Sequence, residues 1–224
     1  MSDGSCEIQM EISGNTAMWT RPDTGDCPVS YPAPTYSAAK GIFESILWGP
    51  AVQVIPTKVE ICALIQYHNY QTNYGGPLRK ARVIAEGGGF QLLATVLIDV
   101  CYRLYAQVVT IPATAKGLIP AKAFQWDAKT TSPGHAYCDI FNRRLKRGQC
   151  FTIPFLGWKE FGPNYFGEFR DTRKVERNIT MVIPSMLREV FSGGYASDCS
   201  YMYDQNVKIT AGVMEYPRGR HYAK

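Results

Sequence analysis

The sequence predicts an α+β fold, and three segments carry this prediction. Residues 6–14 alternate polar and apolar side chains up to a glycine, which is the pattern of a half-buried strand. Residues 35–48 place apolar side chains at helical spacing. Residues 92–111 are strongly apolar and β-branched, which indicates at least one buried strand. A chain of 224 residues with 46% hydrophobic content can bury a substantial core around such elements.

The first helix has recognisable ends. Thr35 or Ser37 can cap its N-terminus, because a side-chain oxygen there can accept a hydrogen bond from a free backbone N–H. Gly49 and Pro50 end it, since proline cannot continue the hydrogen-bond ladder. Residues 51–66, with a break at proline, predict the next strand.

The rest of the chain predicts an insertion, a second helix and a β-rich tail. Residues 67–91 mix tyrosine, asparagine, glycine and basic residues, which indicates a mobile, thumb-like basic excursion. Residues 134–147 predict a helix. The order strand, helix, strand, insertion, strand, helix is compatible with a ferredoxin-like (RRM-like) domain over residues 1–150, followed by a β-rich region over residues 151–224.

Composition bounds the location and chemistry of the protein. No long apolar run or secretory leader is recognisable, so we expect a cytoplasmic protein without membrane contact. The net charge of +5 favours an anionic partner only weakly. The cysteines form no C-x-x-C pair, and this spacing favours reduced thiols without a metal or cofactor. The seven cysteines are Cys6, Cys27, Cys62, Cys101, Cys138, Cys150 and Cys199.

The densest positive charge lies at the end of the second predicted helix. Arg143, Arg144, Lys146 and Arg147 place four cations in five positions. One interpretation is a phosphate clamp, because the arginine fork binds phosphate oxygens in bidentate fashion. The other is favourable pairing of cations with the negative end of the helix dipole, on a solvated face.

Aromatic and basic residues are interleaved in the 67–91 excursion. This combination suits single-stranded RNA, whose bases stack and whose phosphates need neutralising. An ordinary surface hairpin with half-buried tyrosines is the alternative. The residues are Tyr67, Tyr70, Tyr74, Arg79, Lys80 and Arg82.

His135 is a candidate general base beside the basic helix. A metal-independent ribonuclease needs a base for the 2′-hydroxyl, and histidine suits that role near neutral pH. Tyr137 and Lys146 are possible helpers, whereas a histidine without a role is the alternative. The sequence contains no nucleotide-binding glycine motif, G-x-S-x-G or H-E-x-x-H.

Two groups of segments resemble one protein family. Residues 14–22 (GNTAMWTRP) and 30–48 (SYPAPTYSAAKGIFESILW) form the first group. Residues 139–149 (DIFNRRLKRGQ) and 155–161 (FLGWKEF) form the second. Together they resemble the Cas-five family, subtype d, of type I-C CRISPR systems, and they cover about a third of the chain.

The resemblance implies a fold, partners and an activity. It implies a ferredoxin-like RAMP core that holds the 5′ handle of the CRISPR RNA within a Cascade effector. The implied partners are repeat RNA, a backbone subunit, a large subunit and, indirectly, target DNA. The family also cuts precursor RNA without metal. The RNA-binding set we predict is Arg21, Lys40, Arg79, Lys80, Arg82, Arg143, Arg144, Lys146, Arg147 and Lys159.

The sequence departs from the family pattern where the resemblance places catalysis. A histidine or aromatic residue is expected at Leu47, and a Lys-His pair at Ala136 and Tyr137. Leucine and alanine can neither transfer a proton nor stabilise an anionic phosphorane. We therefore expect a binding subunit, with an endoribonuclease built on a relocated site at His135, Tyr137 and Lys146 as the alternative.

Overall fold

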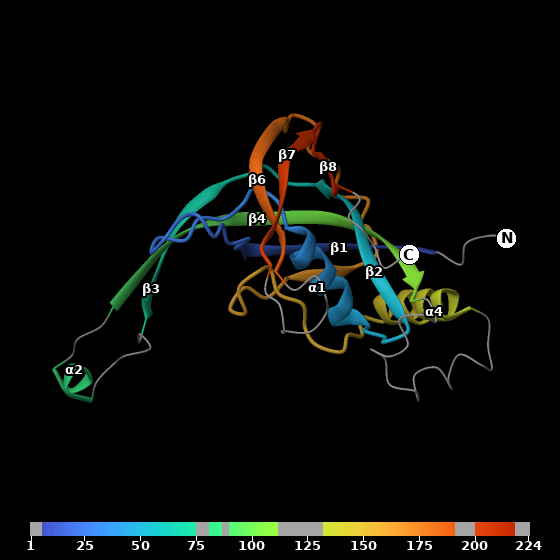
Figure 1. Ribbon diagram of the computed structural model, residues 1–224, viewed down its shortest axis with the longest axis horizontal. Helices are drawn as coiled ribbons and strands as arrows, with labels where there is room; N and C mark the ends of the chain where they lie inside the picture. The colour runs from blue at the N-terminus through green and yellow to red at the C-terminus, as the bar shows by residue number, and fades with distance from the viewer. Residues whose placement is uncertain (1–5, 75–80, 87–89, 112–131, 191–199, 218–224) are drawn as a thin grey trace.

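The chain folds around one long curled antiparallel sheet, as the computed structural model shows (Figure 1). The structure describes residues 6–74, 81–86, 90–111, 132–190 and 200–217. The strands are β1 (Cys6–Ala17), β2 (Val52–Ile61), β3 (Tyr67–Tyr74), β4 (Phe90–Thr110), β5 (Tyr165–Gly167), β6 (Met181–Glu189), β7 (Met202–Thr210) and β8 (Val213–Glu215). The helices are α1 (Tyr36–Ile46), α2 (Ala81–Ala85) and α4 (Pro133–Lys146).

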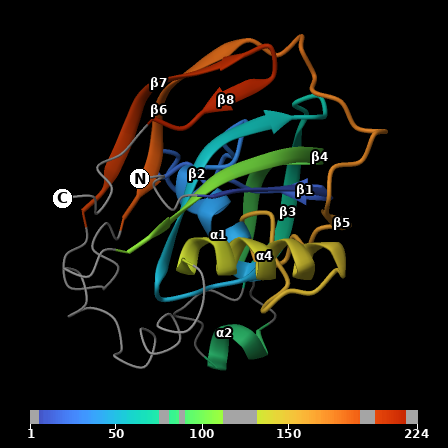
Figure 2. The ribbon, with the colours of Figure 1, turned by 90° about the vertical axis from the view of Figure 1, so that its right-hand side faces the viewer.

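The predicted alternation of strands and helices is confirmed. The sheet order is β5-β1-β4-β2-β8-β7-β6, with β3 paired to the other part of β4. Within it, β1-α1-β2-β4-α4-β5 follows the order strand, helix, strand, strand, helix, strand. Figure 2 shows α4 lying across the sheet. None of the described helices is long and apolar enough to span a membrane.

Helix α1 begins where its capping signal predicted. The Thr35 hydroxyl accepts a hydrogen bond from the Ala38 backbone N–H over 3.2 Å. Ile42 and Phe43 lie on its buried face, 3% and 0% exposed. The helix ends at Ile46, because Leu47 adopts an extended conformation and serves as its C-cap.

The 67–91 excursion is more regular than the sequence indicated. β3 pairs residue by residue with the first part of β4, from Tyr67 opposite Leu97 to Tyr74 opposite Phe90. This hairpin extends to one end of the molecule, where α2 follows β3 (Figure 1). The composition had obscured the ladder because Asn69 and Asn73 have weak strand propensity.

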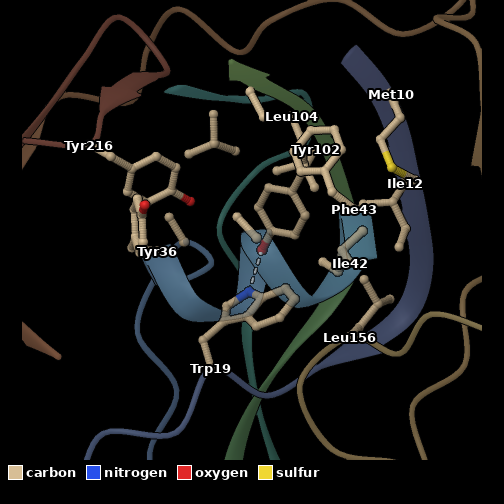
Figure 3. Packing of buried hydrophobic residues seen from close by; sticks show 14 of the residues in the cluster. Met10, Ile12, Trp19, Tyr36, Ile42, Phe43, Tyr102, Leu104, Leu156 and Tyr216 are labelled. Carbon is tan, nitrogen blue, oxygen red and sulfur yellow. Dashed lines mark hydrogen bonds between the residues drawn. The ribbon is translucent and has the colours of Figure 1, made fainter. Parts of the chain in front are cut away.

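The core lies between the sheet and the two long helices. Phe43 of α1 and Phe141 of α4 meet there, with ring centroids 5.8 Å apart. Trp19 donates its indole N–H to the buried Tyr102 hydroxyl over 3.2 Å, as Figure 3 shows. The pairing satisfies two polar groups that would otherwise be costly in an apolar interior.

The sheet is continuous across the predicted boundary at residue 150. β5 pairs with β1, and β8 pairs with β2, so strands from beyond residue 150 extend the sheet of the first part.

A buried carboxylate of β1 holds the chain that follows β5 against the sheet. Glu11 of β1 is 0% exposed, and its Oε1 lies 2.6 Å from Arg170 Nε. Arg103 Nε lies 3.6 Å from Glu11 Oε2, and its Nη2 donates to the backbone oxygens of Arg170 and Arg173.

The cysteine prediction is corrected in one respect. Cys6 of β1 and Cys138 of α4 form a disulfide, although we expected reduced thiols. The spacing did not predict it because the partners are 132 positions apart, and only the packing of α4 against β1 brings them together. The thiols of Cys27, Cys62, Cys101 and Cys150 are free, whereas Cys199 lies outside the described residues.

Candidate nucleic-acid interface

Three segments converge where α1 and α4 end. Arg144 Nη1 donates to the Ile46 carbonyl oxygen over 2.9 Å and so satisfies one of the last carbonyls of α1. The backbone N–H groups of Phe151 and Thr152 donate to Ser45 O over 2.9 and 3.0 Å. These contacts hold the chain after α4 against the end of α1.

Exposed cations gather at this junction. Arg143, Lys146 and Arg147 are solvent-exposed, and none of them pairs with a carboxylate within the described parts of the chain. Arg144 differs, since it is half-buried and caps α1. The charge run thus divides into one arginine with a structural contact and three cations that face solvent.

Large aromatic side chains are exposed beside these cations. Trp48, directly after the α1 cap, is 61% exposed, and Phe151 is 76% exposed. Neither was among the residues predicted to bind RNA. The sequence signal that could have identified Phe151 is its position closely after the charge run. We call Arg143, Lys146, Arg147, Trp48 and Phe151 the basic end. Exposed aromatics beside unpaired cations match the surfaces that bind single-stranded nucleic acid.

The structure brings together the positions where the family resemblance places catalysis. Tyr137 of α4 is 4% exposed, and its hydroxyl donates a hydrogen bond to the Leu47 carbonyl oxygen. Burial raises the pKa of Tyr137 well above that of an ordinary tyrosine, with a further contribution from the Glu44 carboxylate. Near neutral pH this phenol therefore stays protonated, and it donates its proton in the hydrogen bond to the Leu47 carbonyl oxygen.

The relocated triad is not assembled. His135 and Lys146 are both exposed, but they lie 11 positions apart (135 to 146) at opposite ends of α4. A rise of about 1.5 Å per residue separates them by about 16 Å along the axis. Tyr137 points into the core instead of toward solvent. The three side chains cannot contact one phosphate in this arrangement.

The other predicted RNA-binding residues have varied surroundings. Three of them form ion pairs: Arg21 with Asp23 at 2.7 Å, Lys40 with Glu44 at 3.8 Å, and Arg82 with Glu86 at 2.8 Å. Lys159 is exposed on a loop near β3. Arg79 and Lys80 lie outside the described residues. Within the described ranges, no three His, Cys, Asp or Glu side chains come together as a metal site.

Comparison with known proteins gives consistent relatives. The family model described as CRISPR-associated protein (Cas5), subtype d, matches residues 7–174. A protein of Thermus thermophilus, named CRISPR pre-crRNA endoribonuclease Cas5d, is 30% identical over 160 residues. That alignment covers 71% of this chain and 62% of the relative, so the chain spans less than two thirds of its length.

A second relative and a solved structure are also similar to this chain. A protein of the same name from Mannheimia succiniciproducens is 31% identical over 179 residues, covering 73% of each chain. A crystal structure described as a CRISPR-associated protein superimposes with a TM-score of 0.67 at 19% identity, covering 95% of this chain and 92% of its own. The chain therefore belongs to the Cas5 family of CRISPR-associated proteins, subtype d.

Proposed function

We propose that this chain binds CRISPR repeat RNA at the basic end and holds the 5′ handle of the CRISPR RNA in a Cascade effector. The observation that carries the proposal is the convergence, at the junction of α1 and α4, of segments that carry unpaired cations and exposed aromatic side chains. The cations can neutralise phosphates, and Trp48 and Phe151 offer faces on which bases can stack. The names of the relatives, which refer to precursor CRISPR RNA, support the same ligand.

We further propose that this chain does not cleave precursor RNA by the mechanism that the family resemblance implies. A general base must accept the 2′-hydroxyl proton, and a cation or acid must stabilise the scissile phosphate. Leu47 and Ala136 offer neither group. The Tyr137 hydroxyl is engaged by the Leu47 carbonyl and its raised pKa keeps it from acting as a base near neutral pH. The alternative is metal-independent cleavage through His135, which is exposed and which the relatives' names as endoribonucleases favour.

The architecture supports a ferredoxin-like RAMP core. The strand order β5-β1-β4-β2 with two crossing helices is that of a split βαβ arrangement. The β3–β4 hairpin then serves as the thumb-like insertion within residues 1–150, and residues 151–224 supply the β-rich part. We also propose that this chain contacts a backbone subunit and a large subunit of the effector.

The test separates binding from cleavage. Purified protein is incubated with repeat RNA in EDTA, and binding is followed by fluorescence anisotropy while cleavage is followed on a denaturing gel. We expect RNA to bind and stay intact over hours. Cleavage that disappears in His135→Ala would establish the alternative. Cleavage that survives in His135→Ala would contradict both the proposal that this chain does not cut RNA and the proposed site at His135.

Reintroducing the missing groups tests the reason for silence. The variant Leu47→His/Ala136→Lys/Tyr137→His restores a base and a cation at the positions that the structure brings together. We expect it to cut repeat RNA in EDTA at least tenfold faster than the parent, since positioned acid–base groups contribute roughly 10²–10⁴-fold. The single variant Ala136→Lys is the control, because it adds charge without a base.

A further inference from the structure

A recess lies against the middle and outer part of the β3–β4 ladder, away from the end of α4. It encloses about 480 Å³ and is lined by Tyr70 and Thr72 of β3, Leu92 of β4 and the loop at residues 157–160. Figure 1 places the hairpin and α4 toward opposite ends of the sheet. The volume lies in the range of small-molecule sites, which is sufficient for one nucleoside.

The wall formed by the 157–160 loop is held in place before any ligand arrives. Trp158 donates its indole N–H to the Thr20 hydroxyl over 3.0 Å. Gly157 has a φ of +93°, and a Cβ there would overlap the Met18 carbonyl oxygen, so this position requires glycine. Phe161 N–H closes the turn by donating to Trp158 O over 3.0 Å. A wall that needs no ordering on binding lowers the entropic cost of association.

The two aromatic rings that line the recess, Tyr70 and Trp158, are steeply inclined to each other, because each packs against Phe161 in a different orientation. Trp158 stacks on Phe161 with centroids 5.7 Å apart and planes 17° apart. Tyr70 meets Phe161 edge-on at 5.4 Å and 86°. The planes of Tyr70 and Trp158 are therefore close to perpendicular. A flat heteroaromatic ring can stack against one of them while its edge meets the other, as aromatic pairs prefer.

The polar groups at the rim select among flat ligands. Thr72 offers a hydroxyl, and Lys159 and Glu160 offer an exposed ammonium and carboxylate. Neither charge pairs with another charged side chain among the described residues. A carboxylate accepts a hydrogen bond from an exocyclic amino group, as glutamate does from cytosine N4, whereas uracil offers no amino group. The ammonium can contact the adjacent phosphate.

The chain at residues 151–158 connects this recess to the basic end. Along it, Phe151, Ile153 and Phe155 are 76%, 66% and 44% exposed, and Thr152 is exposed as well, whereas Pro154 and Leu156 are buried. Three large apolar side chains of this segment therefore face solvent between the basic end and the recess. From Phe151 to Trp158 the seven steps span at most about 24 Å. A single strand bound at the basic end can follow these side chains to the recess.

We propose that this recess binds one unstacked nucleobase of the same single-stranded RNA, with preference for a base that carries an exocyclic amino group. The inference rests on the proposed function, because the strand reaches the recess from the basic end. It adds a second anchor and a point of base selection, at most about 24 Å from Phe151 of the basic end.

The test moves one abasic position along a fluorescein-labelled single-stranded repeat RNA and measures affinity for the full chain. We expect one abasic position to weaken binding about tenfold, the scale of a stacked base. Tyr70→Ala should weaken binding of intact RNA by a similar factor and show no further loss at that position. Gln71→Ala is the matched control, because Gln71 is the neighbouring exposed residue on the opposite face of β3.

Exposed variants keep the test independent of folding. At the sensitive position, Glu160→Gln should reduce the discrimination between cytosine and uracil while leaving the melting temperature unchanged. If RNA binds and responds to the basic end, but no abasic position depends on Tyr70 and Glu160→Gln leaves discrimination intact, this inference is overturned and the proposed function stands. If no RNA binds to the wild-type chain, the proposed function itself fails.

Discussion

Two groups of arginines in this chain have opposite surroundings. Arg103 and Arg170 lie against Glu11, whose carboxylate is 0% exposed, and their side chains are mostly covered. Arg143 and Arg147, at the basic end, face solvent and have no carboxylate partner among the described residues. The first group holds the chain after β5 onto the sheet. The second leaves its charge available to an anion.

The difference shows that a cation's role follows from its partners more than from its residue type. A buried carboxylate left without its cations is costly, so the Glu11 group is committed to stability. An exposed cation contributes little to folding and can bind phosphate instead. Arg144 lies within the charge run at the basic end, yet it belongs to the structural class because it caps α1.

The largest expected effect is on stability, at the Glu11 group. Glu11→Gln keeps the shape of the side chain and removes the charge, so Arg103 and Arg170 lose their buried counter-ion. We expect a loss of about 3 kcal/mol in the free energy of unfolding, at the low end for a buried pair because Arg170 is partly exposed. Urea denaturation measures it. The control Arg82→Gln breaks an exposed pair with Glu86 and should change stability by less than about 0.5 kcal/mol.

The second prediction concerns RNA affinity at the basic end. Arg143→Gln/Lys146→Gln/Arg147→Gln removes three exposed charges, so RNA binding should weaken by tenfold or more at low salt. The slope of log affinity against log salt should become shallower by about 2, at roughly 0.7 per phosphate contact with a single strand. Folding stability should stay nearly constant. An unchanged salt slope would show that these cations do not contact phosphate.

The third prediction concerns Tyr137, a buried residue at the edge of the basic end. Tyr137→Phe leaves the Leu47 carbonyl without its hydroxyl donor, so we expect a loss of about 1 kcal/mol in stability and no change in RNA affinity. Thermal and urea unfolding, together with anisotropy, would measure both. A loss of RNA affinity without a loss of stability would show that Tyr137 contributes to RNA binding instead of to folding.

The smallest expected effect is the pH dependence of the same residue. Because the pKa of Tyr137 is raised in the folded state, its contribution is fully present below the ordinary tyrosine pKa of about 10 and is lost as pH rises above that value. Stability should therefore fall above about pH 10, and Tyr137→Phe should fall less steeply. Parallel slopes for the two proteins would contradict the raised pKa.

The regular elements of the core could be predicted from local pattern. The Thr35 cap, the strand at β1 and the position of α4 are all local signals, and all three elements are present in the structure. The alternation in β1 correctly predicted a strand but not its burial, because residues 10–14, Glu11 among them, are buried on both faces. The ladder of β3 and the disulfide between Cys6 and Cys138 could not be predicted in this way. The asparagines of β3 have weak strand propensity and obscure the ladder, whereas the disulfide joins positions 132 apart, which spacing does not encode.

The sequence alone determined the residue types available for chemistry: a charge run at 143–147, and leucine and alanine where the family resemblance places catalysis. Only the tertiary structure decided how those residues are used. It divided the charge run, turned Tyr137 into the core and placed Trp48 and Phe151 beside the remaining cations. The reason is that burial and pairing arise when distant segments pack, and these decide whether a side chain stabilises the fold or faces a ligand.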